Sequence, residues 1–216
     1  MLQLYYFPGN ANLAPHMLLE ELGVPYKLVP VDRANNEQKS PAYLKLNPTG
    51  RIPVLIDGDL VLFETAAICL HLVDRHPEAG LAPAVGTDER AEFYKWLVYM
   101  TNTVQSDLLL YFYPERLTDD AGAAAQVKRH AEERISGAGG MMDILEAQLA
   151  KSGGPWLLGA RYSAADPYLM LMARWTRMMA NPARNRKLLG RFLDAMAARP
   201  AVQRAFAQEG LQAPWY

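Results

Sequence analysis

The chain has 216 residues, half of them hydrophobic, with a formal net charge of −1 at pH 7 and a single cysteine. This length allows one large domain or two small ones, the near-neutral charge argues against broad attraction to nucleic acid or anionic membranes, and one cysteine excludes a disulfide within the chain. Because there is no secretory signal, no apolar run near the ~20 residues of a membrane helix and no zinc-type spacing of Cys and His, the sequence predicts a cytoplasmic protein without a metal, nucleic-acid or membrane partner.

The first 77 residues alternate strand and helix patterns. A strand over residues 2–7 ends at Pro8-Gly9, a helix over residues 13–22 ends before Gly23, and a second strand covers residues 26–31. Strand, helix and parallel strand make one right-handed crossover unit. The remaining elements are a short helix over 40–47, two antiparallel strands over 54–56 and 60–63 joined at Asp57-Gly58, and a helix that opens at Thr65. This order is that of a thioredoxin-like domain over residues 1–77.

The rest of the chain reads as helix. A linker over residues 78–87 leads into an all-helical domain over residues 88–216. The predicted helices cover 88–113, 119–151, 168–179, 184–198 and 201–208. Gly137, Gly139 and Gly140 are a weak point in the second of these, because each glycine costs ~1 kcal/mol against alanine in a helix. Ser163 and Asp166 form a capping box ahead of the third.

The stretch from Asn47 to Thr65 combines two features that suit a peptide ligand. Pro53 stands at a strand entrance, where a cis peptide bond would turn the backbone of Ile52 outward to pair with an extended ligand. Glu64 and Thr65 stand at a helix N-terminus, where free N–H groups and the helix dipole attract a carboxylate, while Glu64 can accept from an ammonium. Taken singly, the alternatives are an edge-strand proline and a simple helix cap. Together, the spacing favours a site for the α-amino-acid end of a peptide.

Asn47-Pro-Thr-Gly-Arg-Ile-Pro-Val-Leu, followed by Phe63-Glu-Thr-Ala-Ala-Ile, resembles the glutathione-binding signature of the cytosolic glutathione S-transferases. The resemblance covers the first third of the chain by motif and the rest by layout. It implies a thioredoxin-like α/β N-terminal domain, an all-α C-terminal domain, a homodimer, and glutathione as co-substrate without a metal. The start of the chain is most similar to the bacterial beta-type proteins.

The loop after the first strand departs from the beta-type pattern where the glutathione sulfur would be met. Beta-type proteins carry a cysteine at the position of Ala11 and a serine at that of Asn12, and the serine of insect-type members falls on Asn10. An Asn amide donates N–H groups but has no ionisable proton, so it holds a thiolate by hydrogen bonding and cannot form a mixed disulfide. The asparagine pair is also similar to the loop of nu-type transferases. Asn12 ranks first as the sulfur contact, Asn10 second and Tyr6 third; the alternatives are turn, cap and core roles.

The resemblance implies further contacts. Ile52 pairs its backbone with the cysteinyl part of glutathione, and Arg51 or Lys39 reaches the glycyl carboxylate, the alternative being a plain solvated base. Gln105 or Asp107 reaches the ligand of the partner subunit. The helical domain supplies the second substrate's pocket, and the candidates for its lining are Tyr111, Phe112, Tyr113, Arg116, Trp175 and Met178. For these aromatic and Met residues the alternative is a core role.

These observations predict a glutathione transferase that joins the glutathione thiolate to a small hydrophobic electrophile. The asparagine pair motivates an alternative, glutathione-dependent disulfide reduction. The missing hydroxyl or thiol in the loop motivates another, a glutathione-binding partner module without turnover. Cys69 lies inside a predicted helix and is expected to be a small buried hydrophobe, not a nucleophile.

Overall fold

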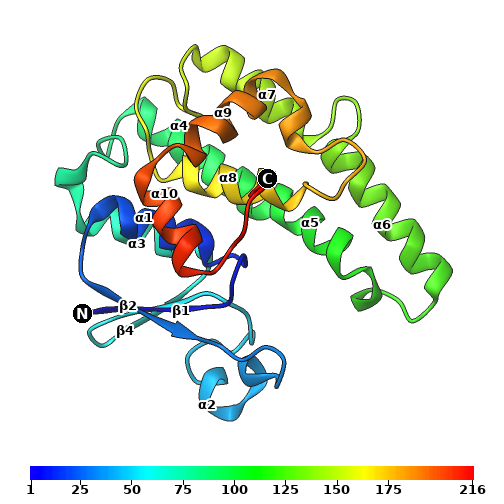
Figure 1. Cartoon of the computed structure of the whole chain (residues 1–216), viewed down its shortest axis with the longest axis horizontal. Helices are drawn as coiled ribbons and strands as arrows, with labels where there is room; N and C mark the ends of the chain where they lie inside the picture. Colours follow the sequence, from blue (N-terminus) through cyan, green and yellow to red (C-terminus); the bar gives the residue numbers. More distant parts are fainter. The chain divides into compact units, whose positions relative to one another are not determined.

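The computed structural model describes residues 1–216, which divide into two compact units. Unit 1 comprises residues 1–82 and 197–215, and unit 2 comprises residues 83–196 together with Tyr216. Figure 1 traces the elements of both units along the chain. No helix of the chain is both long enough and apolar enough to cross a membrane.

Unit 1 is built on a four-stranded mixed sheet. Its strands are β1 (Leu2–Tyr6), β2 (Tyr26–Pro30), β3 (Val54–Asp57) and β4 (Leu60–Phe63), in the spatial order β2-β1-β3-β4. β1 runs parallel to β2 and antiparallel to β3, and α1 (Leu13–Leu22) connects the parallel pair, as the predicted crossover unit requires. The hairpin turn lies one residue later than predicted, at Gly58 and Asp59, and Gly58 takes a φ of 60° that glycine adopts without strain.

Helices cover both faces of this sheet. α1 and α3 (Thr65–Arg75) lie on one side and α2 (Pro41–Leu44) on the other (Figure 1). Tyr43 of α2 packs into a cluster with Val31 and Val54, and its ring meets that of Tyr5 edge-on at 6.0 Å. Leu4 of β1 is fully buried, as are most residues of α1. The sheet and its helices therefore form the thioredoxin-like arrangement that the sequence predicts. Short 3-10 turns lie at η1 (Glu37–Lys39) and η2 (Pro77–Ala79).

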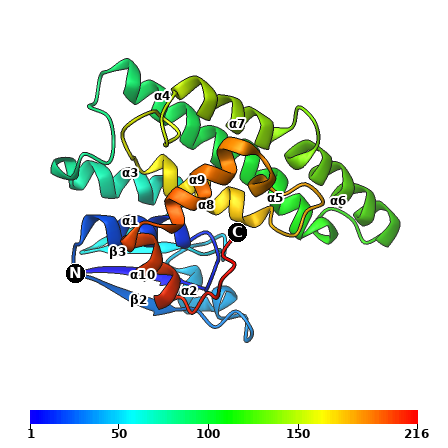
Figure 2. The ribbon, with the colours of Figure 1, turned by 45° about the horizontal axis from the view of Figure 1, so that its top comes forward.

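The last helix, α10 (Pro200–Gln208), packs against α1 in unit 1 (Figure 2). Arg199 at its start pairs with Glu21 through two hydrogen bonds, and Arg204 pairs with Glu20. Residues 197–215, which the sequence assigns to the helical domain, thus lie in compact unit 1. The bidentate ion pair is a contact between residues 178 positions apart, which no local pattern reveals.

Unit 2 is helical throughout. Its helices are α4 (Asp88–Val98), the π-helical η3 (Tyr99–Val104), α5 (Gln105–Phe112), α6 (Ala121–Ser136), α7 (Met141–Ser152), α8 (Ala165–Trp175) and α9 (Lys187–Ala197), with 3-10 turns at η4 (Pro114–Arg116) and η5 (Ala183–Asn185). Every residue of α8 is buried. The predicted capping bond is present, since Asp166 accepts from the Ser163 N–H at 2.8 Å. The helix ends at Trp175, four residues earlier than predicted.

Two predicted helices of unit 2 differ from the observed ones. The helix predicted over 88–113 contains the π-helical segment, where the Thr101 and Gln105 side chains hydrogen-bond the Tyr168 hydroxyl. The helix predicted over 119–151 is two helices, α6 and α7. A Cβ at Gly137 would lie 2.4 Å from the Glu133 carbonyl oxygen, so the chain turns there where only glycine fits.

Candidate active site

The strand register brings three loop segments to one edge of the unit 1 sheet. Tyr5 of β1 lies opposite Val54 of β3, and Val54 lies opposite Phe63 of β4. The chain that leaves β1, the chain that enters β3 and the chain that leaves β4 therefore emerge at the same edge. These segments contain the asparagine loop, the Ile52-Pro53 peptide and the Glu64-Thr65 pair, all of which the sequence singles out.

The turn before β3 is held by the Asn47 side chain. Asn47 is buried, its oxygen accepts from the N–H and hydroxyl of Thr49, and its Nδ2 donates to the Arg51 carbonyl at 2.8 Å. The Tyr43 hydroxyl donates to the same carbonyl at 2.9 Å. These bonds fix the backbone immediately before Ile52, which explains why an asparagine opens the motif.

The Ile52 backbone is unpaired. The Ile52-Pro53 peptide bond is cis, and neither the N–H nor the carbonyl of Ile52 makes a hydrogen bond within the chain. The Lys39 ammonium donates to the Thr49 carbonyl at 3.2 Å, beside this backbone. The Arg51 side chain is exposed. The structure thus places both predicted cations next to the segment that presents Ile52.

Glu64 has an unusual backbone conformation. Its φ of 75° and ψ of 115° lie in a region that non-glycine residues rarely occupy, and its side chain is exposed. The backbone N–H groups of the first α3 residues, Thr65 to Ala67, donate no hydrogen bond within the chain. The Thr65 hydroxyl donates to the Ala11 carbonyl at 3.4 Å, a long bond that a ligand carboxylate would outcompete. An exposed acid and a free helix N-terminus suit an amino-acid group.

Asn12 lies inside unit 1. Its side chain has no exposed surface, its Oδ1 accepts from the Phe7 N–H at 3.1 Å, and its Nδ2 donates to Glu209 at 2.8 Å. Both polar atoms of this amide are engaged with the chain. Asn10 differs, because its Oδ1 accepts from the Ala11 N–H at 2.7 Å while its Nδ2 makes no hydrogen bond within the chain. Of the two side chains, only Asn10 therefore has an amide N–H group without a hydrogen-bond partner.

A buried acid that the sequence does not single out supports this loop. Glu209, just after α10, accepts from the Gly9 N–H at 2.7 Å, from Asn12, and from His16 Nδ1 at 2.7 Å. The side chains of Glu209 and His16 are both fully buried. His16 Nε2 in turn contacts the Tyr26 hydroxyl at 3.0 Å. No sequence signal links residue 209 to the first loop, because the contact depends on how α10 packs on α1.

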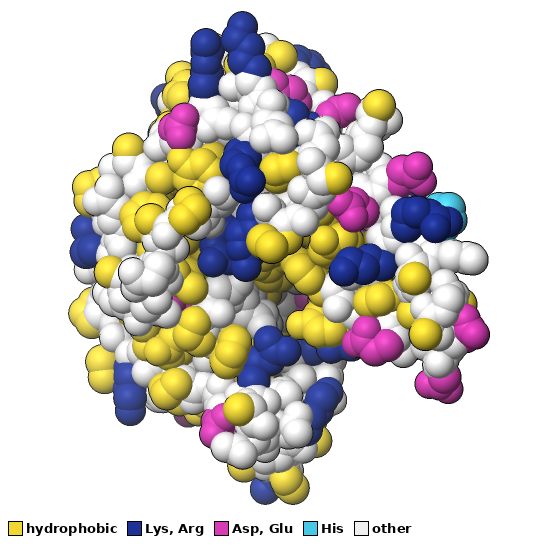
Figure 3. Space-filling view, turned by 45° about the vertical axis from the view of Figure 1, so that its right-hand side comes forward, with side chains coloured by type: hydrophobic (Ala, Val, Ile, Leu, Met, Phe, Trp, Pro, Cys, Tyr) yellow, Lys and Arg dark blue, Asp and Glu magenta, His cyan; other side chains and the backbone are white.

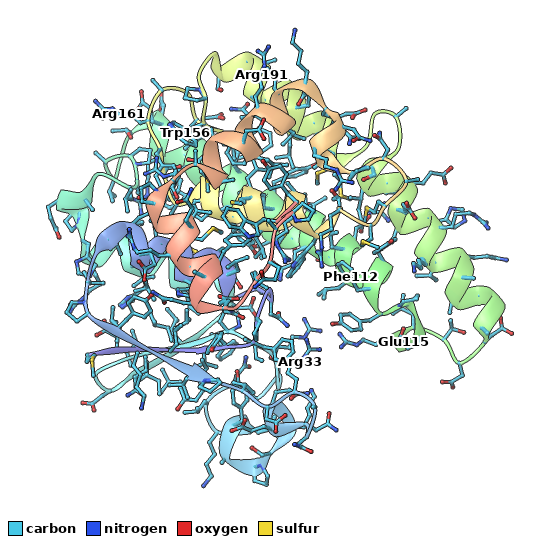
Figure 4. All side chains as sticks on the ribbon, viewed as in Figure 1. Arg33, Phe112, Glu115, Trp156, Arg161 and Arg191 are labelled. Carbon is cyan, nitrogen blue, oxygen red and sulfur yellow. The ribbon has the colours of Figure 1, made fainter.

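Tyr6 and Phe7 end the first strand. Strand alternation puts Tyr6 on the face that carries Leu4, opposite to Tyr5. Phe7 packs at the margin of the Ile52 cluster, and the Arg33 guanidinium stacks 5.0 Å from its ring centre. Arg33 thus adds a cation at the same sheet edge, as Figure 4 shows. The sequence does not single out either Phe7 or Arg33.

Cys69 lies in the core of unit 1, as predicted. It is fully buried in α3, and this burial raises the pKa of its thiol to about 12. A thiol of this kind stays protonated at neutral pH and is shielded from solvent, so it is no nucleophile. The structure contains no group of three or more His, Cys, Asp or Glu side chains placed to hold a metal ion.

Unit 2 gathers several of the predicted pocket residues at the end of α5. The Phe112 ring lies 6.1 Å from that of Trp175 and 6.4 Å from that of Tyr113, and Arg116 stacks on Tyr113. Tyr111 is buried under Lys128, whose ammonium lies 4.8 Å from the ring centre. Burial raises the pKa of the Tyr111 hydroxyl, which makes it a poor acid.

The two predicted partner-subunit contacts are engaged within unit 2. Gln105 accepts from the Tyr168 hydroxyl. Asp107 is 5% exposed and pairs with Arg134 of α6 at 2.9 Å. Burial raises the pKa of the Asp107 carboxyl, and the Arg134 charge opposes that shift. Their roles towards a second subunit stay predictions.

Comparison with known proteins adds family models that cover most of the chain. Residues 1–74 match the model described as "Glutathione S-transferase, N-terminal domain". Residues 104–209 match the model described as "Glutathione S-transferase, C-terminal domain". The first match contains all three loop segments at the sheet edge.

Individual relatives match over nearly their whole length. A glutathione S-transferase of Xanthomonas campestris is 32% identical over 215 residues, covering 97% of this chain and 100% of the relative. A glutathione S-transferase of Zea mays is 32% identical over 222 residues, covering 99% of this chain and 96% of the relative. A solved glutathione transferase homologue from Sulfitobacter, with bound glutathione, superposes with a TM-score of 0.87 at 29% identity, covering 98% of this chain and 99% of that one.

Proposed function

Because the chain belongs to the glutathione S-transferase family of enzymes and has its fold, we propose that it binds glutathione in unit 1 and joins the glutathione sulfur to a small hydrophobic electrophile. The observation that carries the proposal is the unpaired Ile52 backbone at the same sheet edge as Glu64 and the free N-terminus of α3. Each matches one part of a γ-linked tripeptide.

In this proposal the tripeptide lies along the sheet edge. Its cysteinyl backbone pairs with the N–H and carbonyl of Ile52, in the manner of an added strand. Its γ-glutamyl carboxylate accepts from the α3 N–H groups and the Thr65 hydroxyl, and its ammonium donates to Glu64. Its glycyl carboxylate lies towards Lys39 and Arg51, which supply positive charge.

The sulfur then falls near the loop that follows β1. We place Asn10 ahead of Asn12 as its contact, since only the Asn10 amide has an uncommitted N–H. A thiol of pKa ~8.5 is only a few per cent ionised at neutral pH, so a donor that favours the thiolate raises the reactive fraction. The thiolate attacks the electrophilic carbon, a C–S bond forms, and the leaving group departs with its electron pair.

The proposal extends to assembly and location. We expect a homodimer that acts in the cytoplasm and needs no metal for this chemistry. α4 supports the dimer, since Tyr94 and Val98 lie one turn apart on one face of the helix and are 40% and 61% exposed. Exposed apolar side chains that lie together are typical of an interface.

Calorimetry with reduced glutathione tests the docking. Thr65→Val removes the hydroxyl at nearly constant shape, and Glu64→Gln removes the charge that meets the ammonium. We expect each variant to bind glutathione about tenfold more weakly, since a hydrogen bond to a charged group is worth roughly 1.5 kcal/mol or more. Glu78→Gln is the control, because Glu78 is exposed in unit 1 and pairs only with His76. Unchanged affinity in both site variants would remove the proposed docking.

Activity assays separate the proposed conjugation from its rivals. A halonitroarene reports conjugation, and a model disulfide measured in parallel reports glutathione-dependent reduction. Fast conjugation with slow disulfide reduction is the expected result. Reduction alone would favour the disulfide reductase, and glutathione binding without turnover on a panel of electrophiles would favour a binding module.

A further inference from the structure

A tight turn after α5 sets a cation on an aromatic ring. Pro114 stops α5, and the next residues form η4, in which the Arg116 N–H donates to the Tyr113 carbonyl at 3.1 Å. The turn brings the Arg116 side chain back over Tyr113, three residues earlier in the chain. The guanidinium carbon lies 3.8 Å from the Tyr113 ring centre. The Tyr-Pro-Glu-Arg sequence therefore encodes the stack locally.

The same turn borders an exposed aromatic ring. Phe112 is 39% exposed although three aromatic rings surround it: Tyr111 at 5.2 Å, Trp175 at 6.1 Å and Tyr113 at 6.4 Å. Figure 4 labels Phe112 and Glu115 close together at the end of α5. We refer to Phe112, Tyr113, Trp175 and Arg116 as the aromatic platform. Tyr111, Trp175 and Tyr113 meet the Phe112 ring at 79°, 86° and 57°, so none of them stacks parallel to it, and its exposed part can take a further ring.

Arg116 is the cation of the platform. Arg116 is exposed and makes no ion pair within the chain, and its neighbour Glu115 does not pair with it. A guanidinium stacked by its face keeps its N–H edge free, and that edge matches a carboxylate with two parallel hydrogen bonds. Figure 3 shows Lys and Arg side chains among hydrophobic and acidic ones on one face of the molecule.

We propose that the aromatic platform selects, as second substrate, a flat aromatic electrophile that carries an anionic group. The substrate ring stacks on Phe112, and its carboxylate meets the Arg116 guanidinium. This inference rests on the proposed function, because the electrophile is the partner of the glutathione thiolate. The inference is more specific than a hydrophobic pocket, since it assigns an anionic group to the substrate and names Arg116 as the residue that binds this group.

A matched pair of substrates isolates the charge. The anionic member is para-chloro-meta-nitrobenzoate, and the neutral member is its primary amide. In both, the thiolate of glutathione forms a C–S bond at the carbon that carries chlorine, the C–Cl bond breaks, and chloride leaves with the electron pair, while the thiol proton passes to solvent. The two differ only in the group that Arg116 would meet.

Steady-state kinetics with Arg116→Gln test the proposal. We expect KM for the benzoate to rise about tenfold and KM for the amide to change less than about twofold, because one charge-assisted pair is lost for the anion only. KM for glutathione stays unchanged. Arg191→Gln is the control: Arg191 is an exposed arginine on α9 that Figure 4 shows well apart from Phe112 within unit 2. Arg116→Lys keeps the charge without the planar fork and should recover part of the benzoate affinity.

The outcomes separate the inference about the electrophile from the proposed glutathione transferase function. Equal effects of Arg116→Gln on both substrates, or no effect on either, overturn the inference. Wild-type enzyme that conjugates only the amide, or that conjugates neither ring but transfers glutathione to an alkyl electrophile, overturns the inference and leaves the proposed function standing. Wild-type enzyme that binds no glutathione in calorimetry overturns the proposed function itself.

Discussion

At the scale of single residues, Asn10 and Asn12 differ in what their amides already do. The Asn10 Nδ2 is uncommitted, whereas the Asn12 amide is buried between Phe7 and Glu209. Asn10→Ala should therefore raise the pKa of the bound glutathione thiol by about one unit, because losing a hydrogen bond to a charged group costs roughly 1.5 kcal/mol and one unit corresponds to about 1.4 kcal/mol. The pH profile of kcat/KM measures this shift.

The direction in which the pH profile moves follows from the fact that the thiolate, not the thiol, reacts. Since the thiolate reacts, kcat/KM rises with pH through the pKa of the bound thiol, and in Asn10→Ala that rise moves to higher pH. The rate falls about tenfold below the pKa and recovers above it. Asn12→Ala should instead lower the free energy of unfolding, because it leaves buried partners unpaired. A shifted profile in Asn12→Ala and an unchanged one in Asn10→Ala would reverse the two roles.

The sequence predicts the local parts of the site and misses the distant ones. The two segments between Asn47 and Thr65 follow from a motif whose residues shape their own backbone, as the Asn47 turn shows. Whether the Asn12 amide is already engaged depends on Glu209, a partner 197 positions away, and no spacing rule reaches that far. A buried acid is found only when the packing is known.

At the scale of elements, the break between α6 and α7 is held by one ion pair. Arg186 Nε donates to Asp143 at 2.6 Å, its Nη2 donates to the Ser136 carbonyl at 2.9 Å, and Asp143 accepts from the Gly139 N–H at 2.7 Å. We refer to the Arg186–Asp143 ion pair with these hydrogen bonds as the clamp. It connects the last residue of α6 to the first turn of α7. Its hydrogen bond to Arg186 holds the pKa of the Asp143 carboxyl below its ordinary value of 3.8.

A pH dependence follows from that lowered pKa. A group whose pKa falls on folding stabilises the fold above its unfolded pKa, and this contribution disappears as the pH drops through the folded value. Asp143→Asn should therefore unfold at lower denaturant than wild type at neutral pH, with the difference shrinking as the pH falls below 3.8 and vanishing below the lowered pKa of the folded protein. Asp119→Asn, in the loop before α6, serves as control. A difference that grows on acidification would contradict the clamp.

Elements with local signals are predictable here, and elements shaped by tertiary contacts are not. Caps and prolines place several helix starts, including the Thr87 cap of α4 and the Ser40 cap of α2. The π-helical segment is different, because Tyr168 of α8 bonds to Thr101 and Gln105 across the unit. The glycines near residue 137 mark the α6–α7 break in the sequence, but they do not distinguish a bend from a full turn.

At the scale of the whole molecule, the end of the chain supports its beginning. α10 packs on α1, and Glu209 receives three hydrogen bonds from the loop and helix that follow β1: from the Gly9 N–H, from Asn12 and from His16. A fully buried carboxylate is stable only when it is satisfied in this way. The sequence predicts a helical domain up to residue 216, and residues 197–215 of it lie in compact unit 1.

Glu209→Gln tests this return of the chain. An amide keeps one acceptor but turns a donor towards groups that are themselves donors, so breaking the buried network should cost about 2–4 kcal/mol of the free energy of unfolding. Chemical denaturation measures that loss, and Glu78→Gln, which alters only an exposed pair, should cost almost nothing. Hydrogen exchange tests whether Glu209 links α10 to the first loop. In Glu209→Gln the amides of α10 and of residues 9–16 should both exchange faster, while those of α7 exchange as in wild type. Faster exchange confined to α10 would mean that Glu209 does not support the first loop, and the assignment of the C-terminal helix as part of the site would fail.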